Sequence, residues 1–437
     1  MSTHPFRPLR HRAVRLLWSA ALVSDIGTWV QLIVVGSLVA RDTGSAVQTG
    51  LVALATFMPQ GIASPIGGLL ADRFDRRRVF ASALLLQASM TTALAIVLGA
   101  GVREPAVLTA IILVASAAGA LGAPSYQAML PDLVEPDELL AMISLGVYSW
   151  NGGRIVGPML GTLLAAAVGP AWTIGFNALS FVGLSAAVWS LRRTFQPLGG
   201  VDGTITERLV GGWRALRIAP GCFHGVVIAI LVNLTLIPFM GLIPIYATRE
   251  FDGGTGLVGA MSSAQGIGAI IGGLLVTTLA AHLRRSRLMA FVIAWLALAL
   301  LAYSQAPNPV TVVLCAAVLG AGTSAFFVTT SAIVQRDAPP ASRGRIMSLN
   351  QASMGVSYGI GLMTVGLIGD LVDLRIAFAL GAVALVSGFA LARRRSNTWT
   401  EAIDGEPRAI VELAHAWRGV TRSRPIPRPI PSRTSAT

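Results

Sequence analysis

The sequence predicts an all-α membrane protein with twelve transmembrane helices in two pseudo-symmetric six-helix bundles. Three observations lead to this fold class. Hydrophobic residues make up 54% of the chain and charged residues 12%, whereas a soluble domain carries roughly 25% charged residues. Apolar runs of membrane-crossing length recur along the whole chain, and one stretch of the first half returns in the second.

Twelve apolar runs of about 20 residues are each long enough to cross the roughly 30 Å hydrocarbon core of a bilayer. We expect spans at 14–38, 47–70, 79–99, 106–125, 140–168 and 172–191 in the first half, and at 222–247, 256–281, 288–305, 310–334, 346–369 and 376–392 in the second. The 140–168 and 222–247 runs are longer than a span requires, so a tilt or a kink is expected in each.

The distribution of arginine predicts the orientation of the chain. All 33 residues in the lysine-plus-arginine count are arginine. If the N-terminus is cytoplasmic, 28 of them lie in cytoplasmic segments, four lie in outside loops, and Arg154 lies inside a span. Because positive charge accumulates in cytoplasmic loops, both termini are predicted to be cytoplasmic.

An internal repeat predicts two halves of the same orientation. Gln60–Leu70 (QGIASPIGGLL) and Gln265–Leu275 (QGIGAIIGGLL) match at eight of eleven positions with an offset of 205. Parallel halves about an axis along the membrane normal are typical of many transporters. The expected division is a cytoplasmic N-terminus at 1–13, bundles at 14–191 and 222–392, a cytoplasmic linker at 192–221, and a disordered cytoplasmic tail at 393–437.

Several classes of chemistry are excluded by composition. Without lysine, the chain has no Walker A lysine and no Schiff-base lysine, which argues against an ATP-driven pump. Cys222 and Cys315 show no metal-binding spacing and no disulfide framework. No paired carboxylates or nucleophile motif occur outside the apolar runs, so we expect no enzyme, no catalytic residue, no metal and no cofactor. The arginines lie between apolar runs, which indicates a lipid bilayer as partner and not nucleic acid.

Two ionisable residues are predicted to lie inside the membrane, where a charge costs at least about 2.5–3.5 kcal/mol by insertion scales. Asp25 in the first span and Arg154 in the fifth are expected at similar depth, so we predict that they pair or face one aqueous cavity. Trp29 shares a helical face with Asp25, and Tyr148 and Asn151 share a stripe with Arg154. Asp25 is either the proton-coupling group or half of a static ion pair, and the sequence favours neither.

The turn after the second span carries the most specific motif. Gly67–Arg78 reads GGLLADRFDRRR, and it resembles the loop between helices 2 and 3 of major facilitator superfamily transporters. Asp75 stands where that pattern has glycine. The resemblance implies a gating loop in which Asp72 meets the N-terminus of the eleventh helix beside Arg343 or Arg345. The alternative is that the charges only fix topology. The residues assigned to this gating loop are Gly68, Asp72, Arg73, Arg76 and Arg77.

A second element lies in the fifth span. Gly153, Gly157, Pro158 and Gly161 resemble the Gly-x-x-x-Gly-Pro-x-x-Gly element of drug:proton antiporters, which implies export. Small residues four apart also let another helix approach closely, so a purely structural packing face is the alternative reading.

The loops 124–138 and 335–349 are similar to those of the bacterial branch that includes the enterobactin exporter and macrolide-efflux-like proteins. The resemblance implies a secondary transporter in the bacterial inner membrane, which exports a small amphipathic drug, macrolide or siderophore by proton antiport with alternating access. Its expected partners are the small-molecule substrate, protons and the bilayer. Uptake or facilitated transport is the second reading, and a membrane sensor or scaffold of the same fold is the third.

Overall fold

The computed structural model of the chain describes residues 6–191, 195, 213–217, 219–339, 343–395 and 399–405. Most of the predicted linker at 192–221 and most of the predicted tail at 393–437 lie outside the described residues. Within the described ranges, every regular element is a helix. The expectation of an all-α chain is therefore confirmed.

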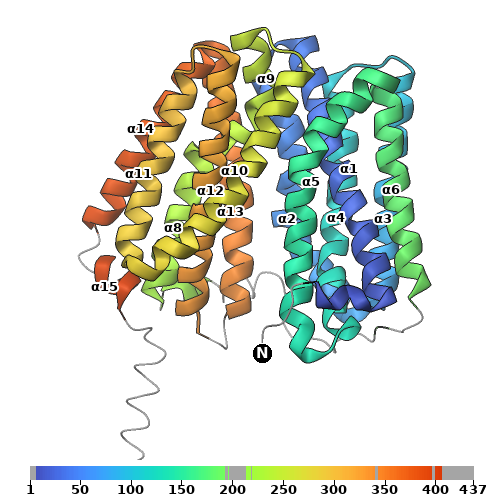
Figure 1. Cartoon of the computed structure of the whole chain (residues 1–437), viewed down its shortest axis with the longest axis horizontal. Coiled ribbons are helices and arrows are strands. Elements are labelled where there is room, and N and C mark those ends of the chain that lie inside the picture. Colours follow the sequence, from blue (N-terminus) through green and yellow to red (C-terminus); the bar gives the residue numbers. More distant parts are fainter. Residues whose placement is uncertain are drawn as a thin grey trace, which may run out of the picture.

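Among the described residues, six long helices form the first half and seven form the second. The first half contains α1 (Arg12–Thr43), α2 (Ala46–Arg73), α3 (Arg76–Gly99), α4 (Pro105–Met129), α5 (Leu139–Val168) and α6 (Pro170–Ser190). The second contains α8 (Pro220–Thr235), α9 (Pro238–Phe251), α10 (Thr255–His282), α11 (Arg285–Ser304), α12 (Pro309–Asp337), α13 (Arg343–Leu371) and α14 (Leu374–Arg395). Figure 1 shows the two halves side by side, with the N-terminus and the short helix α15 (Trp399–Asp404) at its lower end.

The described helices include 11 candidate membrane spans by length and hydropathy, one fewer than the predicted twelve. Helices α8 and α9 together count as one span, Pro220–Phe251. The helix that is not among them is α5, which has 30 residues but contains Asn151 and Arg154. Its polar residues lower its mean hydropathy, although it packs against α1 of its own half and α10 of the second half.

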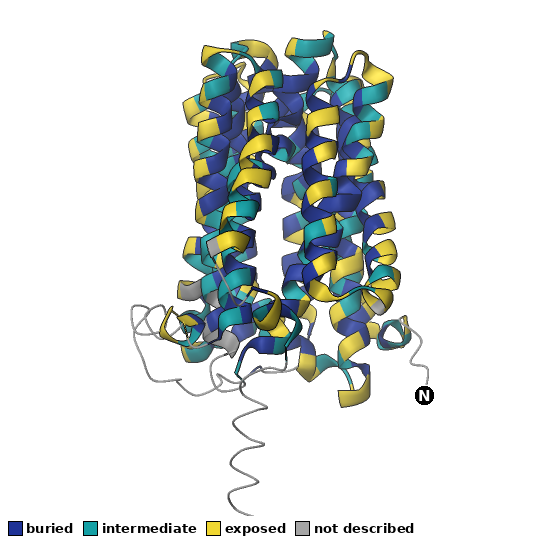
Figure 2. Ribbon diagram, turned by 90° about the vertical axis from the view of Figure 1, so that its left-hand side faces the viewer, coloured by how far each residue is buried: buried dark blue, intermediate teal, exposed yellow. Residues whose placement is uncertain are grey.

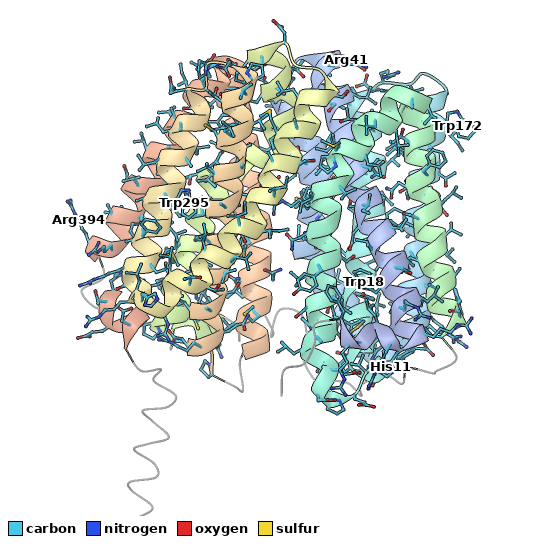
Figure 3. All side chains as sticks on the ribbon, viewed as in Figure 1. His11, Trp18, Arg41, Trp172, Trp295 and Arg394 are labelled. Carbon is cyan, nitrogen blue, oxygen red and sulfur yellow. The ribbon has the colours of Figure 1, made fainter. Side chains whose placement is uncertain are left out.

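The outer surface of the molecule is apolar. Exposed residues recur on the outward faces of the helices along their length (Figure 2). Many of the exposed residues are large and hydrophobic, such as Trp172 at 71% exposed and Leu298 at 68% exposed. Trp172 projects outward near the upper end (Figure 3). A surface of this kind is suited to lipid.

The internal repeat corresponds to equivalent packing in the two halves. A side chain at Gly67 of α2 would collide with the backbone carbonyl of Leu121 on α4, and one at Gly272 of α10 would collide with that of Ala321 on α12. The two glycines are separated by the repeat offset of 205. Each therefore allows a helix–helix approach that only a residue without Cβ permits.

The long 222–247 run, in which a tilt or a kink was expected, is interrupted. Helix α8 ends at Thr235 and α9 begins at Pro238. Proline lacks the backbone N–H that a continuous helix would use, and it suits the first position of a new one. The other long run, α5, continues without a break through Pro158.

The segment predicted to be a disordered tail contains an ordered helix, which corrects that prediction. Trp399 and Ile403 of α15 are buried at 3% and 0% exposure, and the Trp399 ring lies 5.1 Å from that of His224. The carboxylate of Asp404 accepts a hydrogen bond from the backbone N of Ser286 at 2.9 Å. Two apolar side chains four residues apart give this short helix one buried face.

Candidate functional site

A large cavity lies within the first half. Its volume is about 490 Å³, and its lining residues come from α1 to α6 and the turn after α4. The lining is apolar and aromatic, with Trp150 and Tyr126, and includes uncharged polar groups such as Gln60 and Asn151. Among its described lining residues, Asp25 is the only one with a formal charge.

Asp25 is held at the contact between α1 and α5. Its carboxylate accepts a hydrogen bond from the hydroxyl of Ser149 at 2.5 Å. A Cβ at Gly153 would lie 2.9 Å from the Asp25 carbonyl carbon, and one at Gly157 would lie 2.6 Å from the Cβ of Trp29. The glycines of the antiporter-like element therefore bring α5 against the backbone of α1. Gly161 continues this contact one turn further, against Val30.

The predicted pairing of Asp25 with Arg154 is not found, which corrects that prediction. Arg154 instead donates from Nε to Oε1 of Gln265 on α10, at 3.1 Å, and it is not among the residues that line the cavity. Successive residues of an α-helix point about 100° apart. Because Gly153 faces α1, its neighbour Arg154 is turned away from Asp25 and toward the other half.

The other residues predicted to lie near Asp25 and Arg154, namely Trp29, Tyr148 and Asn151, do not all reach the cavity. Trp29 is buried, and its ring lies 5.4 Å from that of Trp150 and 6.0 Å from that of Phe57. Asn151 lines the cavity, whereas Tyr148 is 47% exposed. Only Asn151 of the predicted stripe therefore joins Asp25 at the cavity.

The loop predicted to act in gating, Gly67–Arg78, is attached to its own half through two arginines. Arg76 is 5% exposed and donates to the carbonyl of Ala128 at 2.8 Å. Arg77 donates to the carbonyl of Leu191 at 2.5 Å, with its guanidinium 4.8 Å from the centre of the Trp189 ring. Asp75, which stands at the usual glycine position, accepts hydrogen bonds from the backbone N of Arg77 and Arg78 and caps α3. These arginines thus connect α3 to α4 and α6.

The contact predicted between Asp72 and α13 stays a prediction. Asp72 is half-buried in the last turn of α2 and Arg73 is exposed. The side chains of Arg343 and Arg345 lie outside the described part of the chain. At Gly68, an added Cβ would meet nothing within 4 Å.

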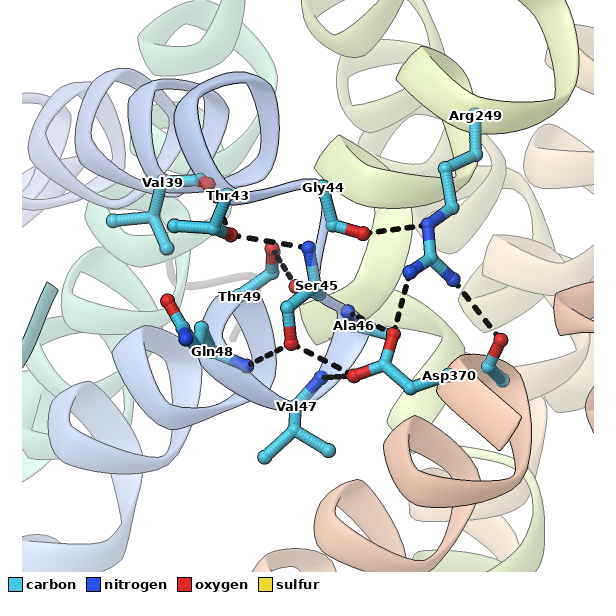
Figure 4. Close-up of polar contacts among 11 residues, drawn as sticks. Val39, Thr43, Gly44, Ser45, Ala46, Val47, Gln48, Thr49, Arg249 and Asp370 are labelled. Atoms are coloured by element: carbon cyan, nitrogen blue, oxygen red, sulfur yellow. Dashed lines mark hydrogen bonds and ion pairs between the residues drawn. The ribbon is translucent and has the colours of Figure 1, made fainter.

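At the upper end, one carboxylate joins the two halves. Asp370, near the end of α13, accepts hydrogen bonds from the backbone N of Ala46 and Val47 at 2.7 and 3.0 Å and from the Ser45 hydroxyl at 2.7 Å (Figure 4). Arg249 of α9 donates to Asp370 at 2.6 Å and to the Gly44 carbonyl at 2.7 Å. We call these five residues and Gly44 the upper gate.

Contacts between the halves extend from the upper end to mid-height. Helices α2 and α13 touch from Ser45–Asp370 down to Gly61, where an added Cβ would lie 3.5 Å from Ala352. Helices α5 and α10 touch from Thr162, which donates to the Thr255 carbonyl at 2.9 Å, down to Arg154–Gln265. Below these points, added Cβ atoms at Gly68 and Gly146 meet nothing within 4 Å.

Sequence reasoning missed the upper gate. Arg249 counted only as one of the four arginines in outside loops, and Asp370 received no role. The available signal was topological, since both residues lie near the ends of spans that finish on the same side of the membrane. Figure 3 shows Arg41 at that end and His11 at the opposite one.

Comparison with known proteins identifies the chain as similar to membrane transporters. Residues 3–418 match the model of the transmembrane secretion effector family. Macrolide efflux protein A of Streptococcus pyogenes is 23% identical over 375 residues, covering 85% of this chain and 92% of that protein. The multidrug efflux pump Tap of Mycobacterium tuberculosis is 29% identical over 388 residues, covering 85% of this chain and 90% of the pump.

Solved structures show the same fold. A bacterial homologue of the iron transporter ferroportin, in an inward-facing state, aligns with a TM-score of 0.66 at 17% identity, over 89% of this chain and 98% of that one. A bacterial homologue of the lysosomal transporter Spinster aligns with a TM-score of 0.64 at 14% identity, over 92% and 97%. The chain therefore belongs to the transmembrane secretion effector family, within the major facilitator superfamily of membrane transporters.

Proposed function

We propose that this chain exports a small amphipathic drug, with a macrolide as the leading candidate, by proton antiport and alternating access. The observation that carries the proposal is a cavity of about 490 Å³ with one carboxylate, Asp25, in a molecule whose halves are joined at the upper end. The names of the relatives, which are macrolide and multidrug efflux pumps, support the same class of substrate.

The lower end is assigned to the cytoplasm. It carries Arg7, Arg10 and the arginines of the Arg73–Arg78 turn, and positive charge accumulates on the cytoplasmic side. With this orientation the upper gate closes the outside, and the lower half of the interface between the bundles faces the cell interior. The described conformation then corresponds to the state that admits a drug from the cytoplasm.

Asp25 is proposed as the group that couples drug to protons. It faces apolar rings and uncharged polar groups, and its hydrogen bond comes from the neutral Ser149. An ionised carboxylate in such surroundings is stabilised either by a proton or by a cationic drug. Because one carboxylate cannot hold both, the two ligands compete, and this competition is the elementary requirement of antiport.

Export is favoured over uptake by the likeness of the Gly153–Gly161 element to that of drug:proton antiporters. Uptake or facilitated diffusion remains the second candidate, and vesicles of defined orientation separate the two. A sensor or scaffold of the same fold is the third candidate, and it requires no substrate movement. Siderophore export belongs to the same class as drug export, and the accumulation measurement tests it when a siderophore replaces the macrolide.

Accumulation measurements test the proposal. Cells that produce the protein are expected to hold less of a macrolide and of the cationic dye ethidium than cells without it. An uncoupler, which dissipates the proton gradient, should bring both kinds of cell to the same level. Equal accumulation before the uncoupler is added would reject drug export, and a difference that survives the uncoupler would reject proton coupling.

A further inference from the structure

A second polar site lies one helical turn above the cavity, where the two halves meet. Nη2 of Arg154 and Nε2 of Gln265 are both buried, and neither has a hydrogen-bond partner among the described residues. A guanidinium is always charged and carries only donors. Here its Nε contacts the oxygen of a neutral amide, and no ion pair within the described ranges includes Arg154.

Two further donors of the same kind lie beside this pair. Nε1 of Trp29 on α1 and Oγ of Ser262 on α10 are also buried without a partner in the described part of the chain. Trp29, Ser262 and Gln265 line one small cavity of about 20 Å³, which is room for about one water molecule. Phe57 lines both this small cavity and the large one, so the donors lie next to the proposed drug cavity and share this ring as a wall.

Buried donors without acceptors destabilise a protein unless something else supplies the acceptor. Four of them come together here from three helices and from both halves. Their combined requirement is for oxygen atoms that accept hydrogen bonds, because the charge of Arg154 repels a cation and favours an acceptor. Asp25, four residues before Trp29 on α1, instead offers a negatively charged acceptor to the large cavity.

We propose that Arg154, Gln265, Trp29 and Ser262 form a subsite that binds an acceptor oxygen of the transported molecule. The acceptor is either a carboxylate or the carbonyl of an ester or ketone. The inference rests on the proposed export, since it concerns the ligand of that transport. It adds a requirement on the substrate, namely an acceptor group placed beyond the part that contacts Asp25.

Three related dyes provide the test, with binding to the purified full chain in detergent measured by fluorescence anisotropy. Rhodamine B carries a carboxylate, rhodamine 6G carries an ester, and pyronin Y has the same kind of cationic ring system with no carbonyl. The wild-type protein is expected to bind both rhodamines about tenfold more tightly than pyronin Y.

The variant Gln265→Glu distinguishes between two roles of the Arg154–Gln265 pair, binding of a ligand and a purely structural contact. The new carboxylate keeps an acceptor beside Nε of Arg154 and strengthens the link between the halves, but it neutralises the guanidinium and removes the amide donor. The preference for both rhodamines should therefore disappear while the affinity for pyronin Y is maintained. Arg154→Gln, which removes the charge and keeps a donor, should weaken only rhodamine B, again about tenfold. Gln305→Glu, at an exposed amide of the upper end, is the control.

Equal affinity of the wild-type protein for the three dyes overturns the subsite, and so does an unchanged preference in Gln265→Glu. Efflux of the dyes from cells is measured separately. A protein that keeps the dye preference but extrudes none of them contradicts the proposed export. A protein that extrudes all three without preference contradicts the subsite alone.

Discussion

Arg249 lies 2.6 Å from the carboxylate of Asp370, and this ion pair belongs to a contact between the two halves. The same carboxylate accepts hydrogen bonds from the first turn of α2. A negative charge at a helix N-terminus is stabilised by the helix dipole. Arg249 and Asp370 both belong to the second half, so the ion pair holds the carboxylate in place. Opening the upper end requires the simultaneous loss of the helix cap, the charge–dipole interaction and the hydrogen bond from Arg249 to the Gly44 carbonyl.

Asp370→Ala should weaken this closure by about 1–2 kcal/mol, the usual contribution of a helix cap together with a dipole interaction. Ala53 is 1% exposed and lies below the gate, close to Gly241 of the second half. A cysteine introduced there, after replacement of Cys222 and Cys315, reports the opening. Membrane-impermeant maleimide added from outside should label it several-fold faster in Asp370→Ala.

The matched control for this gate prediction is Asp42→Asn. Asp42 lies at the same end, but it pairs with Arg41 and Arg103 of its own half, at 3.4 and 3.6 Å. Its removal should leave the labelling rate unchanged. Equal labelling rates in both variants and in the parent protein would mean that Asp370 does not close the upper end.

Asp25→Asn should end uncoupler-sensitive efflux while the protein stays folded. Asparagine has a similar size and can accept the hydrogen bond from Ser149, but it carries no charge and does not titrate. Dye efflux is expected to fall to the level of cells without the protein, and thermal stability in detergent should change little. Glu104→Gln, at an exposed carboxylate, should transport normally. Efflux that persists in Asp25→Asn and still responds to the uncoupler would remove Asp25 from the coupling role.

Gly157→Ala should destabilise the contact of α5 with α1. The new Cβ would lie 2.6 Å from the Cβ of Trp29 and 3.0 Å from the carbonyl oxygen of Ile26, and overpacking of this kind costs about 1–3 kcal/mol. Gly175→Ala on α6 is the control, because a Cβ there meets nothing within 4 Å. The Tm in detergent should fall for the first variant and hold or rise for the second. Equal Tm values would show that the glycine is not needed for packing.

Glu138→Gln should release the N-terminal segment. Glu138 is 0% exposed, and its carboxylate lies 3.0 Å from Arg7, 3.2 Å from Arg10 and 2.8 Å from His11. Removing the negative charge of such a buried group destabilises the folded segment by about 1.5–3 kcal/mol for each hydrogen bond to a charged partner. Trypsin should then cleave after Arg10 or Arg12 at least about tenfold faster. Asp137→Asn, which removes an exposed partner of Arg7, should have a much smaller effect, and equal rates would contradict the role assigned to Glu138.

Features with a local physical cause could be predicted from the sequence. The repeat that contains Gly67 and Gly272 anticipated equivalent packing, because only glycine permits a backbone carbonyl so close. The length of the 222–247 run anticipated a tilt or a kink, and the interruption between α8 and α9 lies within that run. In both cases the physical cause is local, and a single sequence contains it.

The orientation of Arg154 and the upper gate were not predictable in the same way. Depth along a helix is readable from the sequence, but the direction of a side chain around the helix depends on packing against its neighbours, so Asp25 and Arg154 were wrongly paired. Asp370 contacts Ser45 from 325 positions away. No local pattern encodes such a contact, because it forms only when the halves come together.

The glycine-to-carbonyl packing of α2 on α4 and of α10 on α12 has a mechanical consequence. A side chain at Gly67 or Gly272 would push these helices apart, so each pair depends on one close spacing. If the halves move as proposed, we expect the relative motion between the pairs and not within a pair. A substitution in the cavity lining would then change the substrate and leave the motion of the halves unchanged.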